Sequence, residues 1–197
     1  MCISVNNKEQ QDLKENEVMN GNAHFMFGAS VGVGAALALS LNPAQATLLV
    51  STCLLGSIFP DIDNPKSNVG QLTAPVSTVI GKIAKAEGKY GSHHRGMFHD
   101  PFFYTVGLIL AFFFYKPLIG FFIGAFTHLF LDCFNPAGIR FLGVKYINFG
   151  KIPSASKTAK VFTYVMSFLI LGMCIVLSFL NTEWISMAKD WLISNVF

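Results

Sequence analysis

Five apolar segments follow one another along the chain, and polar stretches separate them. Most of these segments, if helical, span about 22–27 Å, somewhat less than the roughly 30 Å of a hydrocarbon core. Their apolar character is nevertheless typical of helices that enter or cross a bilayer. The pattern therefore predicts an all-α, polytopic membrane protein with about five transmembrane helices. The segments cover residues 24–41, 44–59, 101–115, 117–134 and 161–180.

Two proline junctions group the first four segments into pairs. Asn42-Pro43 separates the first two segments, and Lys116-Pro117 separates the next two. Proline ends a helix and is well placed in the first turn of the next one. Each pair is therefore expected to form a helical hairpin. Gly28 and Gly32 lie four apart in the first segment, a spacing that favours close helix packing.

The segments divide the chain into three parts. Residues 1–18 are polar and mixed in charge, without the pattern of a secretory signal, and we expect a mobile polar extension there. Residues 19–181 form the expected membrane-embedded domain, which includes a weak helical stretch near 76–88. Residues 182–197 carry two tryptophans and are expected to form an amphipathic tail in the membrane interface.

Composition supports the membrane assignment. Hydrophobic residues make up 52% of the chain and charged residues 13%, and there are 20 phenylalanines. A single soluble core of this size would not normally bury so much apolar surface, so an unusually apolar soluble helical domain is the weaker alternative. The four cysteines are widely scattered, which predicts neither disulfides nor a thiolate metal site.

The distribution of basic residues predicts an orientation. If all five segments cross, the N-terminus and the polar regions 60–100 and 135–160 lie on one side. That side holds twelve of the fourteen Lys and Arg residues, and only Lys116 and Lys189 lie on the other. Because basic residues concentrate on the cytoplasmic side, we expect these regions to face the cytoplasm from the inner membrane. This topology explains the net charge of +3. The sequence lacks the mixture of basic and aromatic residues that lines a nucleic-acid-binding groove, so we expect no nucleic-acid partner.

All five histidines and several aspartates fall near the same ends of alternating segments. One histidine opens the first segment, two aspartates close the second, three histidines precede the third, and a histidine and an aspartate lie near the end of the fourth. Histidine and carboxylate side chains gathered at one membrane face indicate a divalent-metal site. These residues are His24, Asp61, Asp63, His93, His94, His99, His128 and Asp132.

Two pairs within this set have informative spacing. His128 and Asp132 stand four apart in an apolar helix, so they share one face and can hold one ion. Asp61 and Asp63 follow Pro60, which ends the preceding helix at the interface. A turn at this point can aim both carboxylates at one ion, but Asp-Ile-Asp before Asn-Pro is also typical of an ordinary turn with side-chain hydrogen bonding.

The histidine-rich stretch 92–100 is flanked by glycines, which favours a loop whose imidazoles can be aimed individually. Imidazole binds Zn, Mn or Fe, and an unliganded imidazole can act as a general acid or base. Arg95 is suited to a bidentate grip on phosphate. Asp100, directly before Pro101, is expected to cap the third segment's helix rather than to bind metal.

From Asn22 to Gly150 the sequence resembles the YdjM-type family of LexA-regulated, membrane-bound metal-dependent hydrolases. The resemblance implies a multi-helix inner-membrane hydrolase but names no substrate. A weaker similarity links the same residue types to zinc phospholipase C and related nucleases. The extension before Met19 departs from the family's usual plan. The motifs are Asn22-Ala23-His24, Phe59-Pro60-Asp61-Ile62-Asp63, His94-Arg95-Gly96 with His99, His128-Leu129-Phe130-Leu131-Asp132, and Asn135-Pro136-Ala137-Gly138.

These observations lead to a hypothesis of metal-assisted hydrolysis of a phosphoester in a lipid or lipid-linked substrate at the cytoplasmic face. One or two divalent ions are expected, with Zn before Mn or Fe. Arg95 would hold a nonbridging phosphate oxygen, and His93 would be the general acid or base. The expected metal ligands are His24, Asp61, Asp63, His94, His99, His128 and Asp132.

Two other functions use similar residues. A metal-ion transporter or sensor could use the same ligands, although transport sites are expected near the bilayer midplane rather than at helix ends. Integral lipid phosphatases use a nucleophilic histidine without metal. They also carry a lysine and arginine motif before a Ser-Gly-His segment, and this chain has neither.

Overall fold

The computed structural model describes residues 7–64, 67–86, 97–135, 138–142, 145–150, 152, 156–180 and 183–196. Within these ranges the protein is helical apart from one short antiparallel pair of strands, in which Ile139 lies opposite Ile147. The elements are α1 (Asn7–Ala38), α2 (Pro43–Ile58), η1 (Phe59–Asp63), α3 (Asn68–Leu72), α4 (Ala74–Ala86), η2 (Met97–His99), α5 (Pro101–Phe114), η3 (Lys116–Leu118), α6 (Ile119–Asp132), β1 (Ile139–Phe141), β2 (Lys145–Ile147), α7 (Lys157–Leu180) and α8 (Glu183–Val196).

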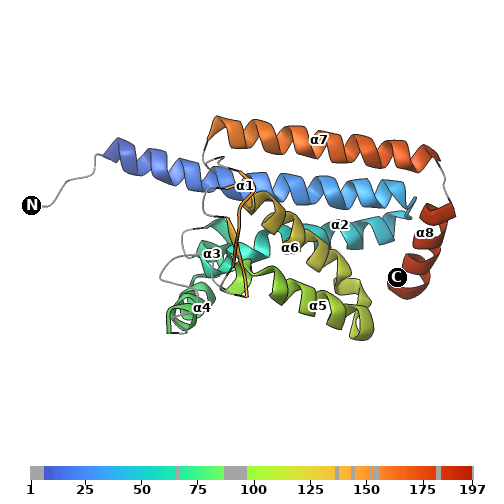
Figure 1. Cartoon of the computed structure of the whole chain (residues 1–197), viewed down its shortest axis with the longest axis horizontal. Helices are drawn as coiled ribbons and strands as arrows, with labels where there is room; N and C mark the ends of the chain where they lie inside the picture. The colour runs from blue at the N-terminus through green and yellow to red at the C-terminus, as the bar shows by residue number, and fades with distance from the viewer. Residues whose placement is uncertain are drawn as a thin grey trace, which may run out of the picture.

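The long helices lie roughly along one axis (Figure 1). Helix α1 packs against α2, α6 and α7, and α6 packs against α2 and α5. Because α2 and α6 run opposite to α1 and α5, one end of the body gathers the end of α2, the start of α5 and the end of α6. The short elements α3, α4 and the β1–β2 hairpin lie at this end, and α8 lies at the other (Figure 1).

Polar caps before proline fix where two of the helices begin. The side chain of Asn42 accepts a hydrogen bond from the backbone of Gln45, and the Gln45 side chain accepts one from the backbone of Asn42. Asp100 accepts a hydrogen bond of 2.9 Å from the backbone N–H of Phe102 and so caps α5, as predicted. These bonds satisfy backbone donors that have no partner inside the helix.

Glycines let the helices approach closely, as the sequence predicted for the first segment. A side chain at Gly28 would collide with Ser57, and one at Gly32 would press on the backbone of Val50, so both glycines face α2. Between α2 and α6 the approach is closer still. A methyl group at Gly56 or Gly124 would overlap backbone atoms of the opposite helix. Such contacts are typical of helix packing in membranes.

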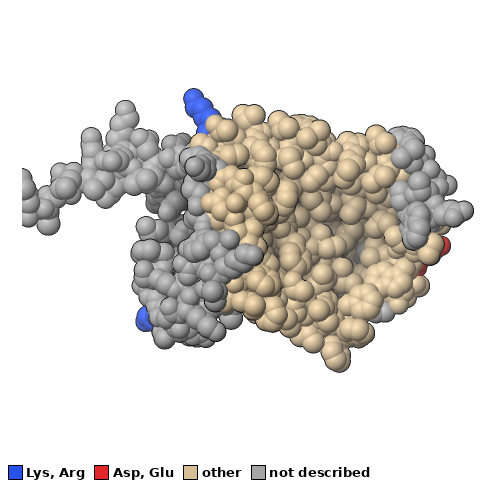
Figure 2. All heavy atoms as spheres, viewed as in Figure 1, with Lys and Arg blue, Asp and Glu red and all other residues tan. Residues whose placement is uncertain are grey.

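The outer surface of the body is apolar. Large hydrophobic side chains are exposed along α7 and the outer side of α5, for example Phe168 (74%) and Phe113 (71%). On the face drawn in Figure 2, charged side chains of described residues appear only at the edges. The windows Pro43–Asp63 and Lys157–Leu177 are long and apolar enough to cross a membrane, and α5 and α6 are shorter apolar helices. The number of five spans stays a prediction.

The helices match the predicted segments closely, with one difference in α1. The first segment was expected to begin at residue 24 after a mobile extension, but α1 is helical from Asn7. Residues 7–20 contain neither glycine nor proline, so nothing in their sequence interrupts the helix. The weak helical stretch near 76–88 corresponds to α4, and the predicted tail helix corresponds to α8.

Candidate metal centre

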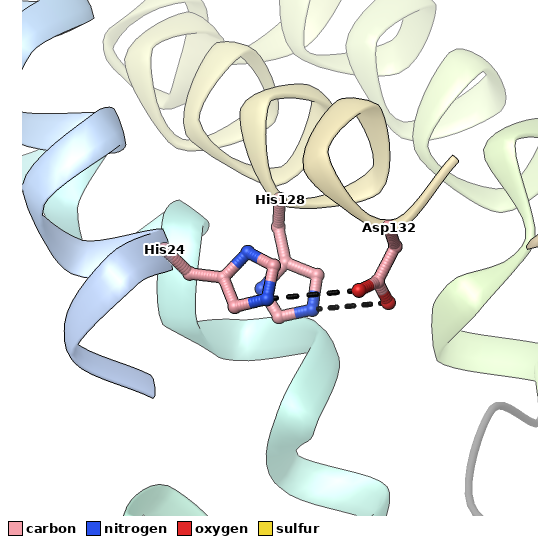
Figure 3. Close-up of side chains that lie close together, drawn as sticks. All are labelled: His24, His128 and Asp132. Carbon is pink, nitrogen blue, oxygen red and sulfur yellow. Dashed lines mark ion pairs between the residues drawn. The ribbon is translucent and has the colours of Figure 1, made fainter. Parts of the chain in front are cut away.

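His128 and Asp132 project from the last turn of α6 into the junction with α1 and α2 (Figure 3). Both side chains are buried, with 1% and 2% of their residue surface exposed. Their spacing of four residues places them on one helix face, and Nε2 of His128 lies 3.7 Å from Oδ2 of Asp132. Burying ionisable groups this completely is costly unless something compensates their charge.

The backbone of α2 orients the His128 ring. Nδ1 of His128 lies 2.7 Å from the carbonyl oxygen of Ser57. A carbonyl can only accept a hydrogen bond, so Nδ1 carries the hydrogen and Nε2 keeps its lone pair. Nε2 is buried and has no hydrogen-bond partner. An imidazole held in this way is prepared to bind a metal ion through Nε2.

The short helix η1 delivers two carboxylates to the same place. Pro60 ends α2, and the chain tightens into a 3-10 turn that contains Asp61 and Asp63. The turn is held by the hydroxyl of Ser67, which donates to the carbonyl oxygen of Asp61 over 2.7 Å. From the sequence, this stretch could either point two carboxylates at a metal ion or form an ordinary turn with side-chain hydrogen bonds. In the structure, both carboxylates point toward His99.

His99 ends the short helix η2, which packs on η1. The hydroxyl of the buried Tyr104 fixes this turn by donating to the carbonyl oxygen of Phe98 over 2.8 Å. The two ring nitrogens of His99 then face different carboxylates. Nδ1 lies 3.5 Å from Oδ2 of Asp63, and Nε2 lies 3.7 Å from Oδ1 of Asp61. Asp63 therefore sits behind the ring, while Asp61 shares its metal-facing side.

Four ligand atoms form a closed ring at the centre of this junction. Nε2 of His99 and Nε2 of His128 each lie 3.6–3.7 Å from Oδ1 of Asp61 and from Oδ2 of Asp132. These separations are too long for hydrogen bonds. The ligand atoms of Asp61, His99 and His128 all lie within 4.8 Å of one another, so one metal ion could contact all three residues.

His24 approaches the ring from α1. Its imidazole stacks on that of His128 with the ring centroids 3.7 Å apart, and its Nε2 lies 3.6 Å from Oδ1 of Asp132 (Figure 3). The same Oδ1 accepts a hydrogen bond of 2.7 Å from the side-chain amide of Asn135. His24, His128 and Asp132 thus make a second group that can hold a metal ion, alongside Asp61, His99 and His128.

The electrostatics of the site favour a cation. Asp61, Asp63 and Asp132 bring three carboxylates together around His99, and their side chains are at most 17% exposed. Burial lowers the pKa of His99, but the carboxylates of Asp61 and Asp63 outweigh burial and raise it to about 10. Positive charge is therefore stabilised at this point. The donor set, the unpartnered Nε2 of His128 and the ring spacing all fit a divalent ion.

The structure brings together six of the nine residues predicted for the site, and the other three, His93, His94 and Arg95, lie outside the described residues. Sequence reasoning gave no role to the carbonyl of Ser57, because a backbone acceptor has no side-chain signature. It also gave none to Asn135. A signal for Asn135 existed, since an amide three residues after Asp132 at a helix end can reach back to that carboxylate.

Comparison with known proteins supports the resemblance seen in the sequence. The family model described as YdjM inner membrane protein matches residues 19–185. Inner membrane protein YdjM of Escherichia coli (strain K12) is 32% identical over 138 residues, which cover 63% of this chain and 65% of that protein. The same values hold for Inner membrane protein YdjM of Shigella flexneri. The chain thus spans about 65% of the length of the curated relatives it matches. No solved structure matches. Because the family match covers most of its length, the chain belongs to the YdjM inner membrane protein family.

Proposed function

We propose that this protein is a metal-dependent hydrolase of the inner membrane that cleaves a phosphoester in a lipid or lipid-linked substrate. The observation that carries the proposal is the ring of two imidazole nitrogens and two carboxylate oxygens. Each nitrogen lies 3.6–3.7 Å from each oxygen, and the side chains of His99, His128 and Asp132 are almost fully buried. Such a mixed nitrogen and oxygen set suits zinc first, and manganese or iron as well.

The residues around the ring have separable roles in this proposal. Asp61, His99, His128 and Asp132 hold the ion, and Asp63 and the carbonyl of Ser57 orient the two imidazoles. His24 either joins a second ion through Asp132 or steadies that carboxylate. When bound, a divalent ion supplies Lewis acidity that polarises a phosphoryl oxygen and makes a water molecule a better nucleophile at neutral pH.

The remaining chemistry is assigned to the histidine-rich loop before His99. Arg95 would hold a nonbridging oxygen of the phosphate, and His93 would donate or accept the proton that the reaction requires. His94 is a further ligand in this proposal. These three assignments come from the sequence, because residues 87–96 lie outside the described residues. The side chain of Asp61 is 17% exposed, the most open of the ring carboxylates, so substrate would approach from the η1 side.

The position of the ring favours a substrate at the membrane surface. Asp61 lies in the last turn of the candidate span Pro43–Asp63, and Asp132 ends the apolar helix α6. A phosphate at the headgroup level of the bilayer could therefore reach the ion without leaving the membrane. Twelve of the fourteen basic residues fall on this side if all five segments cross, which favours the cytoplasmic face.

A direct test measures metal and hydrolysis together. The protein is purified in detergent, its bound metal is quantified, and release of phosphate or headgroup from phospholipids and lipid phosphates is measured. Asp132→Asn should lose both the ion and the activity, whereas Asp190→Asn, which changes an exposed aspartate on α8, should keep both. Wild-type protein that hydrolyses as fast after complete metal removal would overturn the proposal.

A metal-ion transporter or sensor is the alternative function, and it has to be distinguished from a hydrolase. Its expected site near the bilayer midplane does not match a ring built at helix ends. Lipid vesicles with the purified protein reconstituted into their membrane distinguish hydrolysis from ion transport. Uptake of Zn²⁺ or Mn²⁺ that depends on Asp132, without hydrolysis of any lipid tested, would favour transport.

The proposed orientation has its own test. Thr78 is an exposed position on α4, in the region expected to face the cytoplasm. A Thr78→Cys variant in intact cells should resist a membrane-impermeant maleimide and react once the cells are opened. Labelling in intact cells would place the metal centre on the outer side of the inner membrane.

A further inference from the structure

Helix α4 exposes the side chains of two valines instead of burying them. Val76 is 52% exposed and Val79 is 57% exposed, and Leu72, at the end of the preceding helix α3, is 87% exposed. Ser77, between the two valines in sequence, is fully buried. In most water-soluble proteins an amphipathic helix turns its apolar side toward the core. Here the apolar side faces outward, so something outside this chain is expected to cover it.

The side chains of α4 fall into three sectors. At 100° per residue, Val76 and Val79 lie close together on one side, which we call the valine face. The exposed Thr78 and Lys82 lie together on another side. The buried Ser77 lies between these two sectors, and the helix packs on η1. A helix with one apolar side, one polar side that carries a lysine, and one buried side has the pattern of a helix lying flat in a membrane interface.

We propose that α4 lies in the membrane interface with its valine face inserted among lipid headgroups and upper acyl chains of an anionic leaflet. Connectivity places the helix at this level, since the candidate span Pro43–Asp63 ends shortly before it and the apolar helix α5 begins shortly after it. Charge agrees with an anionic surface. Residues 74–90 contain three lysines and a single acidic residue, Glu87.

The consequence concerns the depth of the metal centre. Because α4 packs on η1, inserting the valine face would hold Asp61 and Asp63 at the level of the lipid headgroups. The helix would thus fix how far the ring lies from the membrane surface. This role does not depend on the proposed hydrolysis, and it holds equally for a protein that only binds metal.

The test compares two neighbouring positions on α4. Thr78→Cys and Val79→Cys are made in the full chain and reconstituted into lipid nanodiscs of phosphatidylcholine and phosphatidylglycerol, which leave both membrane faces open. The rate of labelling by a membrane-impermeant maleimide is measured, and wild-type protein gives the background from the natural cysteines. Both side chains are exposed in the structure, so any difference arises from what covers them.

We expect Thr78→Cys to react several-fold faster than Val79→Cys in nanodiscs, and both to react equally in denaturing detergent. Equal rates in nanodiscs would overturn the inference. A disulfide-linked dimer of Val79→Cys under mild oxidation would also overturn it, because a second copy would then cover the valine face. The protection of Val79→Cys should be greater with phosphatidylglycerol than in phosphatidylcholine alone, and equal protection would remove the anionic leaflet from the proposal.

Discussion

Nδ1 of His128 lies 2.7 Å from the carbonyl oxygen of Ser57, which links α6 to the last turn of α2. The bond is possible because the two helices pack closely at Gly56 and Gly124, where any side chain would meet backbone. Helix packing and metal-site geometry are therefore coupled. A change that separates α2 from α6 would move the His128 ring as well as weaken the fold.

The first prediction follows from this coupling. Gly124→Ala should lower the free energy of unfolding by about 1–3 kcal/mol, because its methyl group would overlap the backbone of Cys53. It should also reduce metal affinity, since Ser57 would move relative to His128. Thermal unfolding in detergent and titration with Zn²⁺ measure the two effects.

Gly172→Ala is the matched control for Gly124→Ala. Gly172 lies in α7, and nothing is within 4 Å of the position where a methyl group would stand. Alanine is a better helix former than glycine by about 1 kcal/mol, so this variant should be unchanged or slightly more stable. Equal losses of stability and metal binding in the two variants would contradict the close approach of α2 and α6.

A second prediction separates a ligand from a residue that orients one. Asp61 faces Nε2 of both His99 and His128, whereas Asp63 lies on the opposite side of the His99 ring, facing Nδ1. Asp63→Asn should therefore lower metal affinity about 10–100-fold, the usual cost of losing an orienting partner. Asp61→Asn should cost more, because it removes a charged ligand. Calorimetric titration with Zn²⁺ ranks the two variants, and a larger loss in Asp63→Asn would reverse the assigned roles.

A third prediction concerns metal removal. Asp61 and Asp132 both face Nε2 of His99 and of His128, so a bound cation would be held from both sides. An ion that binds only the folded protein stabilises it by about 2.7 kcal/mol at a hundredfold excess over Kd. Chelation should therefore lower the melting temperature of the wild type. The melting temperature of Asp132→Asn should not respond to chelator, whereas that of Asp190→Asn should fall like that of the wild type.

Much of the helical framework could be predicted from the chain alone. The predicted segments 44–59 and 101–115 correspond to α2 and α5 within one residue at each end. The reason is local, since Asn42-Pro43 and Asp100-Pro101 combine a side-chain cap with a proline that starts a helix. Alternating helix directions then bring the end of α2, the start of α5 and the end of α6 to one end of the body (Figure 1). The aspartates and histidines of these ends lie close together there.

The atomic roles within the site could not be predicted in the same way. The sequence shows that Asp61 and Asp63 are near each other, but only the 3-10 turn decides which carboxylate meets which nitrogen of His99. The close approach of α2 and α6 depends on glycines in two helices separated by more than 60 residues. Their pairing becomes visible only when the helices are placed side by side.

The last prediction concerns Asn135, whose amide donates to Oδ1 of Asp132 over 2.7 Å and leaves Oδ2 directed at His99 and His128. Asn135→Ala should free the carboxylate to rotate and lower metal affinity about 10–100-fold. Co²⁺ substituted into the site should show altered visible bands, which report ligand geometry and not stability. Asn148→Ala is the control, because Asn148 is exposed and its side chain accepts from the backbone of Gly150. Unchanged Co²⁺ bands and affinity in Asn135→Ala would show that Asp132 holds its orientation without this amide.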